Sequence, residues 1–155
     1  MKPNLKKLLI CLAIPLAAGG LSSLLAGGMT GYPQLEQPPL APPGWLFPIV
    51  WTVLFLLIGY ASYRIWNSGQ APTQVRNALL LYAAQLFLNF LWSPIFFGLG
   101  WYLVAFFLLI GLWVLILLTI RAFSQIDEQA GDLLLPYLLW VTFAGYLNLG
   151  VALLN

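Results

Sequence analysis

The chain has 155 residues, of which 62% are hydrophobic and only 6% are charged. Because a soluble domain is about half apolar and about a quarter charged, this composition predicts an integral membrane protein. Histidine is absent and Cys11 is the single cysteine, which excludes histidine zinc sites, Ser-His-Asp triads, Cys-His dyads and an intramolecular disulfide. The net charge of +2 is too small and too scattered to indicate nucleic-acid binding.

Five apolar runs are long enough to cross a bilayer as helices, which takes about 20 residues each. In chain order they cover roughly residues 5–26, 45–66, 75–97, 101–123 and 133–154. They are too long for strands and do not alternate as strands do. The sequence therefore predicts an all-α integral membrane protein, a single domain over residues 1–155 with five transmembrane helices in a bundle.

The first run follows a lysine-rich start and so resembles a signal peptide. Its apolar part extends to Leu25, which is long enough to span, and we therefore expect a retained first helix. Gly19, Ser23 and Gly27 recur every four residues along it. Such a stripe of small residues suits close helix packing, either inside the bundle or in a homodimer, and the sequence leaves both open.

The segment between the first two runs, "GGMTGYPQLEQPPLAPPG" (residues 27–44), is rich in proline. It cannot be helical throughout, yet its prolines make it stiff. A long, stiff loop between membrane helices is more often a lid than a slack linker. We expect a lid over one end of the bundle, and a simple connector is the alternative.

The basic residues predict the orientation. With five spans, all six fall on one side of the membrane: Lys2, Lys6, Lys7, Arg64, Arg76 and Arg121. The other side, which carries the proline-rich loop and the C-terminus, has none. The positive-inside rule then places the N-terminus in the cytoplasm and the C-terminus outside.

Polar and aromatic side chains recur at helical spacing in three of the runs. Gln85, Asn89 and Trp92 share one face of the third helix, and two amides facing lipid would be costly, so that face should look inward. Matching stripes occur in the second and fifth runs: Trp51, Phe55, Ile58 and Ser62, then Tyr137, Trp140, Ala144 and Asn148. Tryptophans near the span ends fit an interfacial belt instead: Trp45, Trp66 and Trp101.

The inward stripes admit two interpretations. They can join helices, since interhelical polar bonds in membranes contribute roughly 0.6 kcal/mol on average. They can also form a ligand pocket, which is typically apolar with a few polar groups. In the second case the aromatic rings would supply the walls, and Asn89 and Asn148 would orient a guest.

Three stretches resemble the signature regions of the TspO/MBR family, which comprises tryptophan-rich sensory proteins of bacteria and the mitochondrial translocator protein, or peripheral benzodiazepine receptor. They are "APPGWLFPIVW" (residues 41–51), "YAAQLFLNFLWSPIFFG" (82–98) and "PYLLWVTFAGYLNLGVALLN" (136–155). The resemblance covers nearly the whole chain in the family's order, although the first span matches only in character. It implies a five-helix bundle, often dimeric, with a cavity capped by the first loop, in a membrane that is here expected to be the bacterial cell membrane.

The resemblance also implies a ligand, because family members bind porphyrins, and some bind cholesterol or benzodiazepine-type drugs. Carried over by motif, the ligand-binding residues are Pro42, Trp51, Phe55, Asn89, Trp92, Trp140, Ala144 and Asn148. Leu40 and Gly31 stand where members often have tryptophan, and Gln37 where lysine is common. No basic residue follows Tyr146, so the sterol-recognition pattern of animal members is incomplete.

These observations favour a membrane receptor or carrier that binds protoporphyrin IX, heme or a similar apolar, lipid-like molecule, with a role in transport or stress sensing. It would need no cofactor, and its partners would be this ligand, membrane lipids and a second copy in a homodimer. One alternative is an enzyme that degrades porphyrin in light through Trp51 and Trp140. Another is a sterol- or lipid-binding scaffold. The acids Asp127 and Glu128 are expected to be solvated loop residues.

Overall fold

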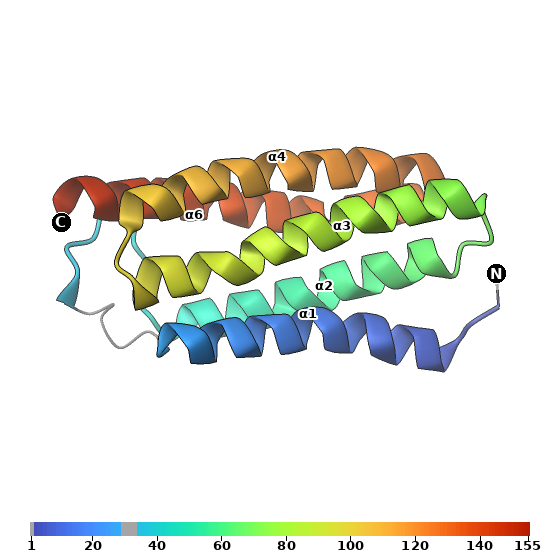
Figure 1. Cartoon of the computed structure of the whole chain (residues 1–155), viewed down its shortest axis with the longest axis horizontal. Helices are drawn as coiled ribbons and strands as arrows, with labels where there is room; N and C mark the ends of the chain where they lie inside the picture. The colour runs from blue at the N-terminus through green and yellow to red at the C-terminus, as the bar shows by residue number, and fades with distance from the viewer. Residues whose placement is uncertain (1, 29–33) are drawn as a thin grey trace.

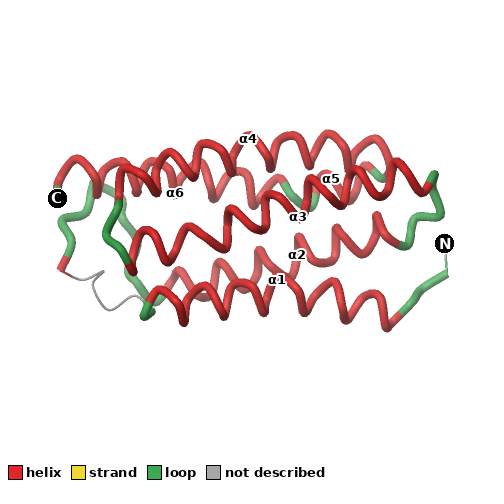
Figure 2. The backbone as a smooth tube through the Cα atoms, viewed as in Figure 1, coloured by secondary structure: helices red, strands yellow, loops and turns green. Residues whose placement is uncertain are grey.

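The computed structural model describes residues 2–28 and 34–155, and the regular structure in these ranges is helical throughout. Five long α-helices follow one another along the chain: α1 (Leu5–Ala26), α2 (Leu46–Trp66), α3 (Pro72–Ser93), α4 (Tyr102–Ile126) and α6 (Leu135–Leu154). A π-helix, Pro94–Gly98, continues α3, and the short α5 (Glu128–Asp132) lies between α4 and α6 (Figure 2).

The five long helices run antiparallel to their chain neighbours, so the N- and C-termini lie at opposite ends of the bundle (Figure 1). α1 and α2 lie along one side, α4 and α6 along the other, and α3 passes between them (Figure 1). Each of the five spans is long and apolar enough to cross a membrane. The predicted fold class is confirmed.

The helix ends differ from the predicted ones by a few residues. α3 begins at Pro72, three residues early, because proline suits the first turn of a helix, where its missing N–H needs no partner. α4 continues to Ile126 and stops at Asp127, which has an extended backbone and accepts a hydrogen bond from the Gln129 N–H (3.1 Å) as the N-cap of α5.

Asp127 is not the solvated loop acid that the sequence suggested. Its Oδ2 accepts a hydrogen bond from the Arg64 Nε at 2.7 Å, which ties the end of α2 to the α4–α5 junction. Burial alone would raise the pKa of Asp127, but the hydrogen bond and charge of Arg64, with the backbone N–H groups of Gln129 and Ala130, hold it below its ordinary value.

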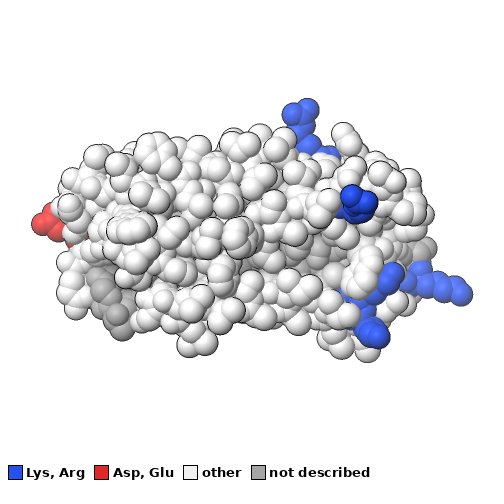
Figure 3. Space-filling view, in the orientation of Figure 1, with Lys and Arg blue, Asp and Glu red and all other residues white. Residues whose placement is uncertain are grey.

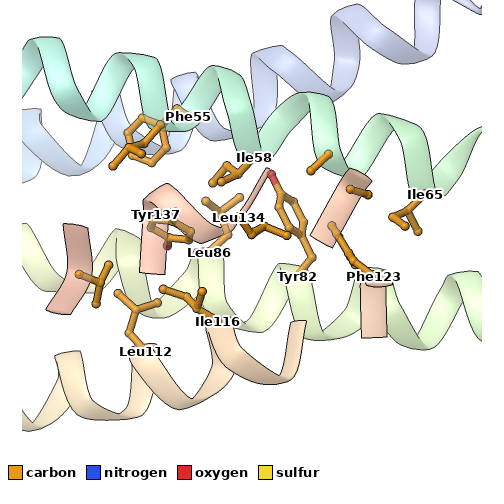
Figure 4. Packing of buried hydrophobic residues seen from close by; sticks show 14 of the residues in the cluster. Phe55, Ile58, Ile65, Tyr82, Leu86, Leu112, Ile116, Phe123, Leu134 and Tyr137 are labelled. Atoms are coloured by element: carbon orange, nitrogen blue, oxygen red, sulfur yellow. The ribbon is translucent and has the colours of Figure 1, made fainter. Parts of the chain in front are cut away.

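A solid apolar core fills the half of the bundle nearest the N-terminus. Figure 4 shows Ile58 of α2, Leu86 of α3 and Ile116 of α4 converging there, with Tyr137 of α6 at the same level. All four side chains are buried. The same cluster also contains Phe55 and Ala144, so the core continues toward the other half of the bundle.

The small residues of α1 act within the bundle. A Cβ atom at Gly19 would collide with the ring of Phe55 on α2, and a Cβ at Gly59 of α2 would lie 2.6 Å from the Cys11 carbonyl oxygen of α1. Glycine is therefore required for the close approach of α1 and α2. Gly27 does not continue this contact, because it ends α1 as a left-handed C-cap with φ 75°.

The described part of the proline-rich loop, residues 34–44 (hereafter the lid), is docked on α6. The buried ring of Pro38 lies against Gly150, where an added Cβ would be 2.5 Å from Pro38 Cγ. The Tyr146 hydroxyl donates to the Pro39 carbonyl (2.6 Å). The Asn155 amide accepts from the Glu36 N–H (3.2 Å) and donates to the Glu36 carbonyl (3.0 Å). Gly31 and Pro33 of the predicted loop lie outside the described residues.

The charges follow the predicted polarity. Lysine and arginine side chains gather at the end of the bundle where α1 begins, and an acidic region appears at the opposite end (Figure 3), where the lid carries Glu36. The long surface between these two ends is uncharged in this view (Figure 3). Such an uncharged band between two polar ends is what an integral membrane protein requires. The prediction that the chain is an integral membrane protein is therefore confirmed.

Candidate functional site

A cavity of about 320 Å³ lies in the half of the bundle nearest the lid, between α1, α2, α3, the π-helix and α6. The structure brings seven of the eight sequence-predicted site residues to its wall: Trp51, Phe55, Asn89, Trp92, Trp140, Ala144 and Asn148. Three helices far apart in sequence thus place their aromatic and amide side chains around one space. The volume lies at the small end of the range for ligand pockets, roughly 300–1,000 Å³.

Pro42, the eighth predicted residue, is not among the residues that line the cavity. The lid turns sharply where the Ala41 N–H donates to the Pro38 carbonyl (3.3 Å), and Pro42 lies beyond that turn, half-buried on the way to α2. The lid residue at the cavity is Gln37 instead. Sequence reasoning noted Gln37 only as a departure from the family pattern.

Gln85 shares a helix face with Asn89 but does not reach the cavity. It is fully buried, and its Oε1 accepts a hydrogen bond from the Tyr137 hydroxyl (2.6 Å). That hydroxyl in turn accepts one from Asn89 Nδ2 (2.7 Å). Gln85 therefore joins α3 to α6 beneath the cavity, which is the helix-joining interpretation of the stripe.

Asn148 is also committed to a partner within the bundle. Its Oδ1 accepts a hydrogen bond from the Trp92 indole N–H (2.9 Å), and its Nδ2 donates to the Tyr102 carbonyl (2.7 Å). The side chain is buried, with 1% of its surface exposed. Asn148 therefore fixes the orientation of the Trp92 ring and cannot also turn its amide freely toward a guest.

Two polar groups at the wall are left without protein partners. The Trp140 indole N–H is buried and has no hydrogen-bond partner among the described residues. The Oδ1 of Asn89 is likewise unpaired in that part of the chain, because only its Nδ2 is engaged. An unpaired buried donor is unfavourable, and because the Trp140 N–H has almost no accessible surface, a bound molecule could accept from it only if the indole ring turned toward the cavity.

Edge-to-face contacts hold the aromatic wall in place. The Trp51 ring lies 6.4 Å from that of Trp140 at an interplanar angle of 86°, and 6.3 Å from that of Tyr137 at 74°. It also lies 5.5 Å from the ring of Phe55. Contacts of this kind are favoured by the quadrupoles of the rings, and they present a preformed apolar surface to the cavity.

The π-helix supplies a part of the wall that sequence reasoning missed. It begins at Pro94, and the Leu99 N–H bonds to the Pro94 carbonyl five residues earlier (2.9 Å). It places Phe96 and Phe97 at the cavity, with the Phe96 ring stacked 4.9 Å from Trp92. Pro94 itself was a usable signal in the sequence, because proline lacks an N–H and interrupts a regular α-helix, and π-helices often lie at functional sites.

The cavity reaches the lipid-facing surface between α1 and α2. Five of its lining residues are exposed, and all five belong to these two helices: Leu16, Gly20, Ser23, Pro48 and Thr52. Gly20 has no side chain, and a Cβ built there would meet nothing within 4 Å. The opening therefore faces the acyl chains, whereas the lid covers the outer end of the bundle.

The wall is uncharged, because none of the described residues that line the cavity is acidic or basic. Residues 2–28 and 34–155 also hold no group of three or more acidic, cysteine or histidine side chains that could bind a metal ion. The wall of the cavity is therefore suited to an apolar molecule.

Comparison with known proteins agrees with the architecture. The model of the TspO/MBR family matches residues 11–154. The tryptophan-rich protein TspO of Chlorobaculum tepidum is 38% identical and spans 100% of this chain and 99% of its own length. The tryptophan-rich sensory protein of Cereibacter sphaeroides is 40% identical, spanning 80% of this chain and 76% of its own. The translocator protein of Bos taurus is 41% identical over 78% of this chain and 72% of its own. The chain is a member of the TspO/MBR family.

Proposed function

We propose that this protein is a membrane receptor or carrier that binds a porphyrin, or a similar planar apolar molecule, in the cavity between α1, α2, α3 and α6. The relatives named as a sensory protein and as translocator proteins support a sensing or carrier role. The observation that carries the proposal is the aromatic, uncharged wall of this cavity, in which the rings of Trp51 and Trp140 lie edge to face.

The geometry suggests how the ligand is held. One edge of a macrocycle would enter the cavity and lie against Trp51 and Trp140, and the remainder would project between α1 and α2, because about 320 Å³ is small for a whole tetrapyrrole. Burial of apolar surface contributes roughly 25 cal/mol per Å² taken from water, and less for a ligand that arrives from lipid.

The distribution of basic residues predicts where the carboxylates of a bound porphyrin would lie. No basic residue lines the cavity or belongs to the lid, so the propionates of a porphyrin would stay in water or meet neutral donors. Affinity should then change little with salt, since there is no exposed ion pair to screen. A steep loss of affinity with added salt would contradict this arrangement.

The test is a titration of tryptophan fluorescence with protoporphyrin IX, heme and a sterol. Trp140→Phe keeps a ring at this position but removes part of the aromatic surface that the ligand would contact, so we expect affinity for the porphyrins to fall roughly 5- to 10-fold, as for the loss of about 1 kcal/mol of aromatic contact. Trp101→Phe is the matched control, because Trp101 is exposed and does not line the cavity. Equal porphyrin affinities for wild type and Trp140→Phe would show that the porphyrin does not bind against Trp140 in this cavity.

A second candidate function rests on the contact between Trp51 and Trp140 in the cavity wall. A light-excited porphyrin can take one electron from an indole, leaving an indole radical cation and a porphyrin radical anion. Addition of O2 from air to this radical anion would form a carbon–oxygen bond on the macrocycle and so destroy its conjugation. Illumination with protoporphyrin IX in air tests this function. Bleaching of the porphyrin that is lost in Trp51→Phe and Trp140→Phe, measured at saturating ligand, would favour it, and equal bleaching without protein would exclude it.

A further inference from the structure

A second hollow lies on the outside of the bundle, where α2 ends and α3 begins. It is a groove of about 500 Å³ at the basic end, and it shares no lining residue with the cavity between the helices. Its residues come from Trp66, the α2–α3 connection and the first turns of α3. The groove is therefore at the level where a bilayer meets water.

One wall of the groove is aliphatic. Val75, Leu79 and Leu80 form it, and Leu80 is 55% exposed. From Pro72 to Leu80 the helix advances roughly 12 Å along its axis, which takes this wall from the water boundary into the acyl-chain region. Trp66 lies at the outer part, where an indole is favoured at a membrane interface.

The groove also carries an uncompensated positive charge. Arg76 lines it and makes no ion pair or hydrogen bond within residues 2–28 and 34–155, in contrast to Arg64, which is paired with Asp127. Lys7 Nζ lies 4.9 Å from the centroid of the Trp66 ring, so a second cation stands beside the groove. None of the described residues that line the groove is acidic.

We propose that this groove binds one anionic phospholipid, with its phosphate against Arg76 and an acyl chain along Val75, Leu79 and Leu80. The order of the groups along the membrane normal favours a phospholipid over other occupants. The cation lies at the membrane boundary and the aliphatic wall lies deeper, as the phosphate and the acyl chains of a phospholipid do. A soluble anion would contact only the cation, and an apolar helix would contact only the aliphatic wall. Arginine suits phosphate because its fork of donors pairs with two oxygens, and basic side chains beside a membrane attract anionic lipids.

Native mass spectrometry of the full chain, released from mixed micelles of phosphatidylglycerol and phosphatidylcholine, tests the proposal. We expect one retained phosphatidylglycerol in preference to phosphatidylcholine. Arg76→Gln should lower its retention on the order of fivefold, and Arg76→Lys should restore most of it. Arg121→Gln is the matched control, because Arg121 is exposed on α4 at the same end but lies outside the groove.

A variant that fills the groove distinguishes lipid binding in the groove from general attraction of anionic lipid to the basic end of the protein. Leu80→Trp keeps every charge and changes an exposed position, so the bundle should fold, which circular dichroism checks. We expect it to lose the retained lipid. Equal losses in Arg76→Gln and Arg121→Gln, or full retention in Leu80→Trp, would overturn the proposal, and displacement of the lipid by inorganic phosphate would assign the groove to a soluble anion instead.

Discussion

At the scale of single residues, the Tyr137 hydroxyl links two helices next to the site. Its hydroxyl is shared by two amides, donating to Gln85 (2.6 Å) and accepting from Asn89 (2.7 Å), at a position with no exposed surface. It therefore joins α3 to α6 directly beneath the cavity. Among the described residues, neither Gln85 Oε1 nor Asn89 Nδ2 has a hydrogen-bond partner other than Tyr137.

Tyr137→Phe should destabilise the protein by about 1–3 kcal/mol, because it leaves Gln85 Oε1 and Asn89 Nδ2 unpaired in a buried setting. Thermal unfolding in detergent measures the change. Tyr60→Phe is the control, because Tyr60 is exposed and its hydroxyl makes only a 3.4 Å contact with Arg64. Equal melting temperatures for Tyr137→Phe and wild type would show that the two amides find other partners.

Asp127 makes a pH-dependent contribution at the same scale. Its pKa is lower in the folded chain than the unfolded value of about 3.9. The ion pair with Arg64 therefore stabilises the fold fully above that unfolded value, and the stabilisation is lost as pH falls through the lower folded pKa. For a pair at the protein surface the size should be ~1 kcal/mol or less.

Asp127→Asn should therefore reduce the melting temperature slightly at pH 7 and have no further effect near pH 2. Parallel melting curves across pH for wild type and the variant measure this difference. Glu128→Gln is the control, because Glu128 is exposed and makes no ion pair among the described residues. A gap between Asp127→Asn and wild type that widens on acidification would contradict the assigned sign.

At the scale of elements, the lid depends on α6. The Tyr146 hydroxyl and the Asn155 amide bind three backbone groups of the lid, and Pro38 is buried against Gly150. The prolines of the lid supply few donors of their own. The side chains of α6 therefore provide much of the polar contact that holds this segment over the end of the bundle.

Tyr146→Phe should loosen the lid without changing the bundle. Hydrogen exchange at the amides of residues 34–37 and 40–41 should accelerate several-fold, because local opening becomes easier by roughly one hydrogen bond, on the order of 1 kcal/mol. Leu153→Ala, an exposed change on the same helix, is the control. Unchanged exchange in Tyr146→Phe would mean that Pro38 and Asn155 are sufficient to hold the lid.

The elements also show which features can be predicted from sequence. Span number and inward faces were predictable, because length, hydrophobicity and the cost of amides in lipid decide them locally. Whether an inward amide reaches the cavity was not predictable, because that depends on the neighbouring helix. Tyr137 engages Gln85 Oε1 and Asn89 Nδ2, and among the described residues it leaves the Asn89 Oδ1 without a partner. That the cavity is lined by Gln37 of the lid and not by Pro42 was unpredictable for the same reason, since docking on α6 decides which lid residue meets the cavity.

At the scale of the whole molecule, the bundle divides into a solid half and a hollow half. Ile65, Ala78 and Phe123 belong to the core that fills the basic half, and aromatic rings surround the cavity in the other. The hollow half opens toward lipid between α1 and α2, while the lid covers its end. A ligand that partitions into the bilayer would therefore reach the cavity from the side.

Gly20→Phe tests this lateral route. A side chain at Gly20 has open space, so the fold should survive, but a phenyl ring there would narrow the opening. We expect the association rate of protoporphyrin IX delivered from vesicles to fall by about tenfold, measured by stopped-flow quenching of tryptophan fluorescence. Gly145→Phe is the matched control, because Gly145 on α6 also has open space around it and lies outside the cavity wall. An unchanged rate in Gly20→Phe, together with a faster rate in Tyr146→Phe, would place the route beneath the lid, because only a looser lid would then admit the ligand.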